Sequence, residues 1–148
     1  MVSTNEGPSA RTFPSMTYHD TDQSAFLFGG SKVLFGKSPS PSNLLNDTWL
    51  FKSGKWTQLS TQNVPTPRAE AAIAYDKATN RVVLFGGYLI EGTDYVKLQD
   101  TWEFYDGDWH LSSESGPSAR NGAAMVFDES EGHVLLFGGS TIDKSYGP

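Results

Sequence analysis

One pattern occurs three times along this chain, and the three copies stay in register. The motif Pro-x-x-Arg occupies residues 8–11, 65–68 and 117–120, and Phe-Gly-Gly follows it at 28–30, 85–87 and 137–139. The arginines and the glycines of successive copies are separated by the same two intervals, 57 and 52 residues. A repeat of this length is typical of one small structural unit that buries its apolar faces only by stacking on its neighbours. The chain is therefore expected to form an array of such units.

Each complete copy reads as four short strands, which we name a to d in chain order. Strand a is expected at 15–18, 71–75 and 123–127, strand b at 25–30, 81–87 and 133–139, strand c at 48–51 and 101–105, and strand d at 56–60 and 109–112. Strands a and b are short, apolar and bounded by turn residues, as strands covered on both faces are. Glycine in the c–d connections can supply the positive φ of a tight hairpin. No segment has a sustained helical period, so essentially no helix is expected.

Asp-Thr-Trp opens strand c at 47–49 and 100–102, and a second tryptophan follows at Trp56 and Trp109. Together with Phe-Gly-Gly at the end of strand b and a period near 50, these motifs resemble the Kelch repeat over almost the whole chain. The resemblance implies an all-β fold in which each repeat is one four-stranded antiparallel blade of a β-propeller. A single Kelch-like propeller segment is expected at 1–148, as an incomplete ring of about two and a half blades. Blade 1 is expected at about 8–60, blade 2 at about 65–113 and half-blade 3 at about 117–148.

The ends of the chain fall inside the repeat pattern. Residues 2–11 align without a gap with residues 111–120, which close a strand d. The final residues correspond to the b–c connection of the third copy. We expect such a segment to be cut from a longer array, with its open edges covered by further blades or by self-association, because propellers remove their edges by closing the ring.

Residues that recur in the copies are expected to be structural. The two glycines after each phenylalanine allow close backbone approach, each arginine is expected to bond neighbouring loop backbone, and the tryptophans are expected to pack between blades. These residues are Gly29, Gly30, Gly86, Gly87, Gly138, Gly139, Arg11, Arg68, Arg120, Trp49, Trp56, Trp102 and Trp109.

Few catalytic or metal-binding chemistries find support in the sequence. There is no cysteine, and His19, His110 and His133 lack metal-ligand spacing. No nucleophile elbow or phosphate-binding loop occurs. Acidic clusters lie in turns at 20–22, 106–108 and 128–131, where capping of the turn is the favoured interpretation. The chain is therefore expected not to be an enzyme and to need no metal or cofactor.

Charge and hydropathy restrict the partners. The net charge is −6 and no basic stripe is visible, so neither nucleic acid nor an anionic membrane surface is expected as a partner. No stretch has the length of a transmembrane helix, and the first residues do not resemble a signal peptide. The compartment stays open, and a cell-surface or extracellular setting is compatible with a segment of a longer protein.

The b–c connections differ most between copies, and variable loops on a rigid scaffold are where binding sites usually lie. In the order a to d, the b–c and d–a connections emerge at one end of the blades. The hypothesis is a non-enzymatic Kelch-type recognition module that binds a protein or glycan there. Two alternatives stay open, a fragment of a propeller enzyme with its active site on other blades, and a truncated fragment with no independent function. The candidate binding residues are Tyr88, Glu91, Tyr95, Lys97, Lys32 and Lys37.

Overall fold

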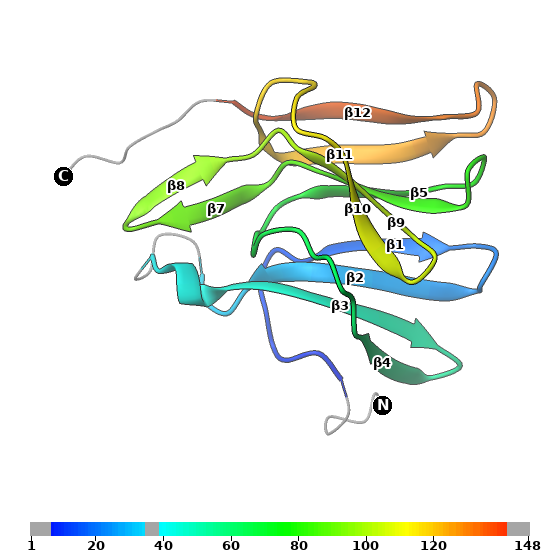
Figure 1. The fold of residues 1–148 in the computed structure, drawn as a ribbon, viewed down its shortest axis with the longest axis horizontal. Helices are drawn as coiled ribbons and strands as arrows, with labels where there is room; N and C mark the ends of the chain where they lie inside the picture. Colours follow the sequence, from blue (N-terminus) through cyan, green and yellow to red (C-terminus); the bar gives the residue numbers. More distant parts are fainter. Residues whose placement is uncertain (1–6, 35–38, 142–148) are drawn as a thin grey trace.

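The computed structural model describes residues 7–34 and 39–141, and these ranges form a stack of antiparallel sheets (Figure 1). Two sheets have four strands each. Blade 1 contains β1 (Ser15–His19), β2 (Ser24–Ser31), β3 (Leu44–Lys52) and β4 (Lys55–Leu59) in that spatial order. Blade 2 contains β5 (Ala72–Asp76), β6 (Arg81–Phe85), β9 (Thr101–Tyr105) and β10 (Asp108–Ser113), also in chain order from one edge to the other. The predicted all-β architecture of four-stranded antiparallel blades is confirmed.

The third copy contributes two paired strands within the described ranges. These are β11 (Asn121–Asp128) and β12 (His133–Ser140), and they form the half-blade. β11 lies beside β5, as β5 lies beside β1, so the first strand of each blade follows the preceding one around the stack (Figure 1).

Equivalent residues pair in equivalent registers in the two full blades. Phe28 is opposite Thr48 in blade 1, and Phe85 is opposite Thr101 in blade 2. Phe51 is opposite Trp56, as Phe104 is opposite Trp109. Positive φ at Gly54 and Gly107, and at the residue before each, gives both c–d hairpins the same tight turn. The sequence repeat is therefore a repeat of strand register.

The described residues contain almost no helix, as expected, with one short 3-10 helix, η1 (Pro41–Asn43), before β3. One feature differs from the sequence-based expectation. The second b–c connection is not an irregular loop, because it folds into a separate hairpin of β7 (Tyr88–Glu91) and β8 (Asp94–Lys97). Each of these strands has only four residues. An alternation of apolar and polar residues over so short a length does not distinguish a strand from a loop.

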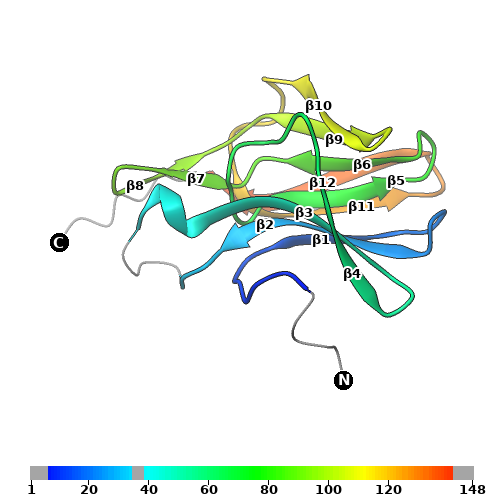
Figure 2. The same cartoon turned by 60° about the horizontal axis from the view of Figure 1, so that its bottom comes forward.

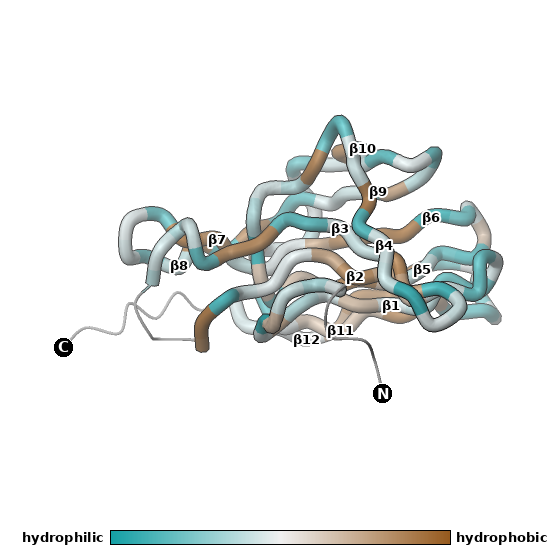
Figure 3. Tube along the Cα trace, turned by 90° about the horizontal axis from the view of Figure 1, so that it is seen from below, coloured by the Kyte–Doolittle hydropathy of each residue, from teal (hydrophilic) through white to brown (hydrophobic). Residues whose placement is uncertain are grey.

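The main core lies between blades 1 and 2. Phe26 and Phe28 from β2 meet Trp109 from β10, with Tyr75, Val82 and Leu84 in the same buried cluster. Figure 3 shows hydrophobic segments on β2, β5 and β6 in the interior of the stack and hydrophilic turns at its ends. The apolar faces of the two sheets thus cover each other, as blade stacking requires.

Candidate functional site

The two ends of the blades are built differently. The connections β2–β3, β4–β5, β6–β9 and β10–β11 emerge at one end, which we call the loop face. The short turns β1–β2, β3–β4, β5–β6, β9–β10 and β11–β12 emerge at the other, which we call the turn face. Figure 2 shows β7, β8 and η1 together at the loop face. The structure therefore places the two most divergent connections of the sequence at the same end of the molecule.

A repeated network of arginine and aspartate side chains joins the connections of the loop face to the ends of the strands. In blade 2, Arg68 Nη1 and Nη2 each donate to a different carboxylate oxygen of Asp100 at 2.7 Å, and Nη1 also donates to the carbonyl of Gly86 at 3.1 Å. Trp102 Nε1 donates to Asp100 Oδ2 at 2.7 Å. The guanidinium thus ties the d–a connection to the end of strand b and to the start of strand c.

Blade 1 repeats this network atom for atom. Arg11 donates to both carboxylate oxygens of Asp47, at 2.6 and 2.9 Å, and to the carbonyl of Gly29 at 3.0 Å. Trp49 Nε1 donates to Asp47 Oδ2 at 2.6 Å. Two-pronged arginine–carboxylate pairs of this kind combine fixed geometry with charge-assisted hydrogen bonds. These aspartates are occupied by structural bonds.

The networks change the acidity of both carboxyl groups. Burial raises the pKa of Asp47, but hydrogen bonds from Arg11 and Trp49 and the charge of Arg11 outweigh it, so the pKa lies below its usual 3.8. Burial also raises the pKa of Asp100. The hydrogen bonds and charge of Arg68 and the hydrogen bond from Trp102 outweigh this effect, so the pKa is lowered overall. Both carboxyl groups therefore stay ionised in the folded protein at neutral pH.

The third arginine has no carboxylate partner within the described residues, although Arg120 Nη2 donates to Ser118 Oγ at 2.7 Å. Arg120 Nη1 donates to the carbonyl of Gly138 at 2.9 Å, and Nε donates to the carbonyl of Ser118 at 2.9 Å. The aspartate that pairs in the other blades opens strand c, and no strand c is present in the described part of the third copy.

The β7–β8 hairpin is firmly seated on the loop face. Ala69 and Tyr88 exchange two backbone hydrogen bonds of 3.0 and 3.1 Å. Tyr88 is only 3% exposed and packs with Ile90 of the same hairpin, with Ala69 of the β4–β5 connection and with Leu44 of blade 1. The hairpin is therefore a rigid extension of the scaffold that also joins two blades.

The candidate binding residues occupy different environments. Tyr88 is buried, and Tyr95 meets it edge to face with ring centres 5.2 Å apart. Glu91 and Lys32 are exposed, and Lys32 Nζ donates to the carbonyl of Ser42 at 3.3 Å. Lys97 Nζ donates to Ser140 Oγ at 3.3 Å. A partner at this face can reach the side chains of Glu91 and Lys32 directly, whereas Tyr88 supports the hairpin from within. Lys37 lies outside the described residues.

Sequence reasoning did not single out Glu70. Its φ is 55°, and Phe13 and Gly122, at the same repeat position, also have positive φ. Glu70 N donates to the carbonyl of Phe13, Gly122 N donates to the carbonyl of Glu70, and Glu70 Oε2 accepts from Asn121 Nδ2 at 2.6 Å. The d–a connections are thus linked into a chain across the three copies. In the sequence, these three residues could have been recognised as equivalent because each lies two positions after the arginine of its copy.

The recurring acidic turns belong to the turn face. Lys77 forms ion pairs with Asp20 of blade 1, at 2.6 Å, and with Glu129 of the half-blade. The hydrogen bonds that Lys77 donates to these two carboxylates raise its pKa. Across the described ranges no three histidine or acidic side chains are grouped as a metal site requires. The described part also has no helix with the length and apolar character needed to cross a bilayer.

The sheet order, the register and the blade stacking define a β-propeller segment. The solved structure of YjhT, a β-propeller, is similar with a TM-score of 0.70 and 15% identity, over 94% of this chain and 40% of that one. No family model matches the chain.

Two curated proteins contain similar segments. The tRNA wybutosine-synthesizing protein 4 of Emericella nidulans is 29% identical over 128 residues, which cover 78% of this chain. The flagellar outer-arm dynein alpha chain of Chlamydomonas reinhardtii is 30% identical over 138 residues, which cover 90% of this chain. The chain spans 11% and 3% of the length of these relatives.

Proposed function

We propose that this chain is a Kelch-type, non-enzymatic recognition segment that binds a protein or glycan through its loop face. The observation that carries the proposal is the β7–β8 hairpin, an extension of blade 2 that is held on the loop face by backbone bonds and a buried aromatic ring and that has no equivalent in the described part of blade 1. A rigid, divergent extension on a repetitive scaffold is typical of a recognition surface.

Two further observations support a binding module. The recurring arginines and aspartates of blades 1 and 2 are engaged in the scaffold, as shown by Arg68 and Asp100, and so are not arranged as a catalytic constellation. The similar segments in the two curated relatives lie within much longer proteins that have unrelated names. A segment that recurs in such different contexts is more typical of a binding module than of an enzyme that performs one particular reaction.

The test is a binding screen with charge-reversed variants. The chain would be screened on a glycan array and on an immobilised peptide library, in parallel with the double variant Lys32→Glu/Glu91→Lys. This variant keeps the net charge and changes two exposed loop-face side chains. The matched control is Lys55→Glu/Glu131→Lys, which makes the same exchange at exposed positions on the turn face.

Ligands retained by the control and lost by the loop-face variant would support the proposal, and the array on which they occur would show whether the partner is glycan or protein. Ligands lost only by the control, or no ligand on either array, would contradict binding through the loop face.

A further inference from the structure

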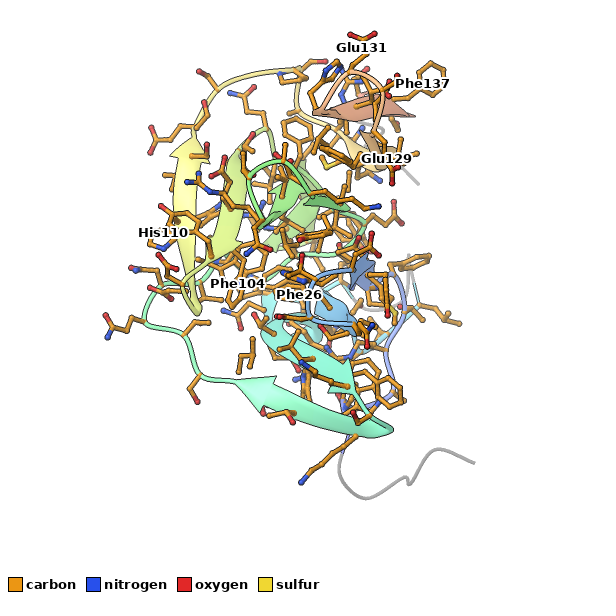
Figure 4. The ribbon with its side chains drawn as sticks, turned by 90° about the vertical axis from the view of Figure 1, so that its right-hand side faces the viewer. Phe26, Phe104, His110, Glu129, Glu131 and Phe137 are labelled. Atoms are coloured by element: carbon orange, nitrogen blue, oxygen red, sulfur yellow. The ribbon has the colours of Figure 1, made fainter. Side chains whose placement is uncertain are left out.

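The third copy carries an apolar face that is buried in the other two. Phe28, Phe85 and Phe137 occupy the same repeat position, and they are 1%, 3% and 83% exposed. Val126 and Leu135 are paired across β11 and β12 on the side of Phe137 and are also exposed. Figure 4 shows Phe137 projecting away from the body, while Phe26 and Phe104 lie between two sheets. We call Val126, Leu135 and Phe137 the trailing face.

Blade 1 carries the opposite half of the same kind of interface. Tyr18 is 55% exposed, whereas its equivalent Tyr75 is 5% exposed and lies against blade 1. Trp56 is half-buried, whereas its equivalent Trp109 is fully buried against blade 1. We call Met16, Tyr18, Phe51 and Trp56 the leading face.

The interface between blades 1 and 2 shows how two such faces fit. Trp109 packs against Phe28 and Phe26, with ring centres 5.1 and 5.7 Å apart. Tyr75 stacks on His19 at 4.1 Å, and its hydroxyl is hydrogen-bonded to Thr21 at 2.6 Å. Phe137 and Leu135 stand in the repeat where Phe28 and Phe26 stand, and Trp56 and Tyr18 stand where Trp109 and Tyr75 stand.

We infer that a second copy of this chain docks head to tail, with its leading face on the trailing face of the first. Trp56 of one copy then lies over Leu135 and Phe137 of the other, as Trp109 lies over Phe26 and Phe28 within the chain. The occupant is a second copy because one chain carries both complementary halves, and because the new contact continues an interface that the chain already forms.

The contact is heterologous, so a first pair still carries one open leading face and one open trailing face. Such contacts continue until a ring closes or a filament grows. The contact also brings Glu129 of one copy toward Asp20 of the next, and these like charges are each already paired with Lys77 of their own chain. Added salt is therefore expected to strengthen the association, because it screens this repulsion and leaves apolar contacts intact.

Sedimentation velocity with two single-face variants tests the inference. The wild-type chain is expected to form concentration-dependent species larger than a dimer. Phe137→Glu blocks the trailing face and Tyr18→Glu blocks the leading face, so each variant alone is expected to be monomeric. An equimolar mixture is expected to form a one-to-one dimer, because it retains a single productive pair of faces. Val64→Glu, at an exposed apolar position in the β4–β5 loop, is the control and should assemble like the wild type.

A monomeric wild type would overturn the inference, and so would variants that still assemble or a mixture that gives no dimer. A cross-linking experiment covers the case in which a charged variant fails to fold. The natural chain has no cysteine, so Trp56→Cys and Phe137→Cys introduce unique thiols. A short bis-maleimide should join Trp56→Cys to Phe137→Cys in the mixture and should not join Phe137→Cys to itself. Equal cross-linking in all combinations would contradict head-to-tail docking.

Discussion

The indole N–H of Trp109 donates a hydrogen bond to the hydroxyl of Thr48, 3.0 Å away, across the interface between the two complete blades. Both residues are fully buried. The same indole meets Phe28 and Phe104 at steep angles, with ring centres 5.1 and 5.4 Å apart. One side chain thus supplies both the apolar filling and a polar tie between neighbouring sheets.

Replacement of Trp109 should therefore weaken the whole stack. We expect Trp109→Ala to lower the free energy of unfolding by about 3–5 kcal/mol, because it leaves a large cavity. The matched change Trp56→Ala, at the equivalent but half-buried position, should cost clearly less in dilute solution. Urea denaturation followed by tryptophan fluorescence measures both values, and equal losses would contradict the assignment of Trp109 as the interblade residue.

Two equivalent glycines of the Phe-Gly-Gly motifs have similar backbone angles but different neighbours. Gly86 and Gly138 both have positive φ, at 64° and 76°. A Cβ at Gly86 would lie 2.6 Å from the carbonyl oxygen of Arg120, whereas at Gly138 nothing lies within 4 Å. Gly138→Ala should cost about 1–2 kcal/mol for the left-handed backbone alone. Gly86→Ala should cost several times more, because backbone must also move. Thermal melts of the two variants test this, and similar melting temperatures would contradict it.

The arginine of blade 2 should matter more than that of the half-blade. Arg68 is buried and paired with Asp100, whereas Arg120 bonds backbone at an exposed position. Arg68→Met strands a partly buried carboxylate and should cost about 3–5 kcal/mol. Arg120→Met removes only exposed hydrogen bonds and should cost about 1 kcal/mol or less. Guanidinium chloride titration of both variants provides the measurement, and an equal loss would show that the ionic pair adds no stability.

The same ion pairs predict an acid limit to stability. The pKa values of Asp47 and Asp100 are lowered in the folded state, so their contribution is fully present above the unfolded value of 3.8. It is lost as the pH falls below 3.8 and through the lower folded-state values, because the unfolded chain then binds protons more readily than the folded chain. These two aspartates should therefore cause no change in the melting temperature near neutral pH. Below about pH 4 the melting temperature should drop steeply.

Asp100→Asn should flatten part of that acid-induced drop while lowering stability at neutral pH. A melting curve of the variant with the same acid slope as the wild type would exclude Asp100 as a source of the pH dependence.

The repeat made the blades predictable from sequence, since each strand is short, apolar and marked at its ends by turn residues at fixed intervals. It also allowed the variable b–c connections to be placed at one end. The hairpin in the second connection was not predictable. Its stability comes from Tyr88 packing on Leu44 of the other blade, a contact between residues far apart in the chain.

The sequence by itself determined the repeat, the four short strands of each blade and the kind of residue at each repeated position. Only the tertiary structure decided which copies of a residue are covered. Phe28 and Phe137 are the same residue in the same motif, yet one is buried and the other is exposed. Burial depends on the neighbouring sheet that packs against a strand, and for a stacked repeat that neighbour differs from one copy to the next.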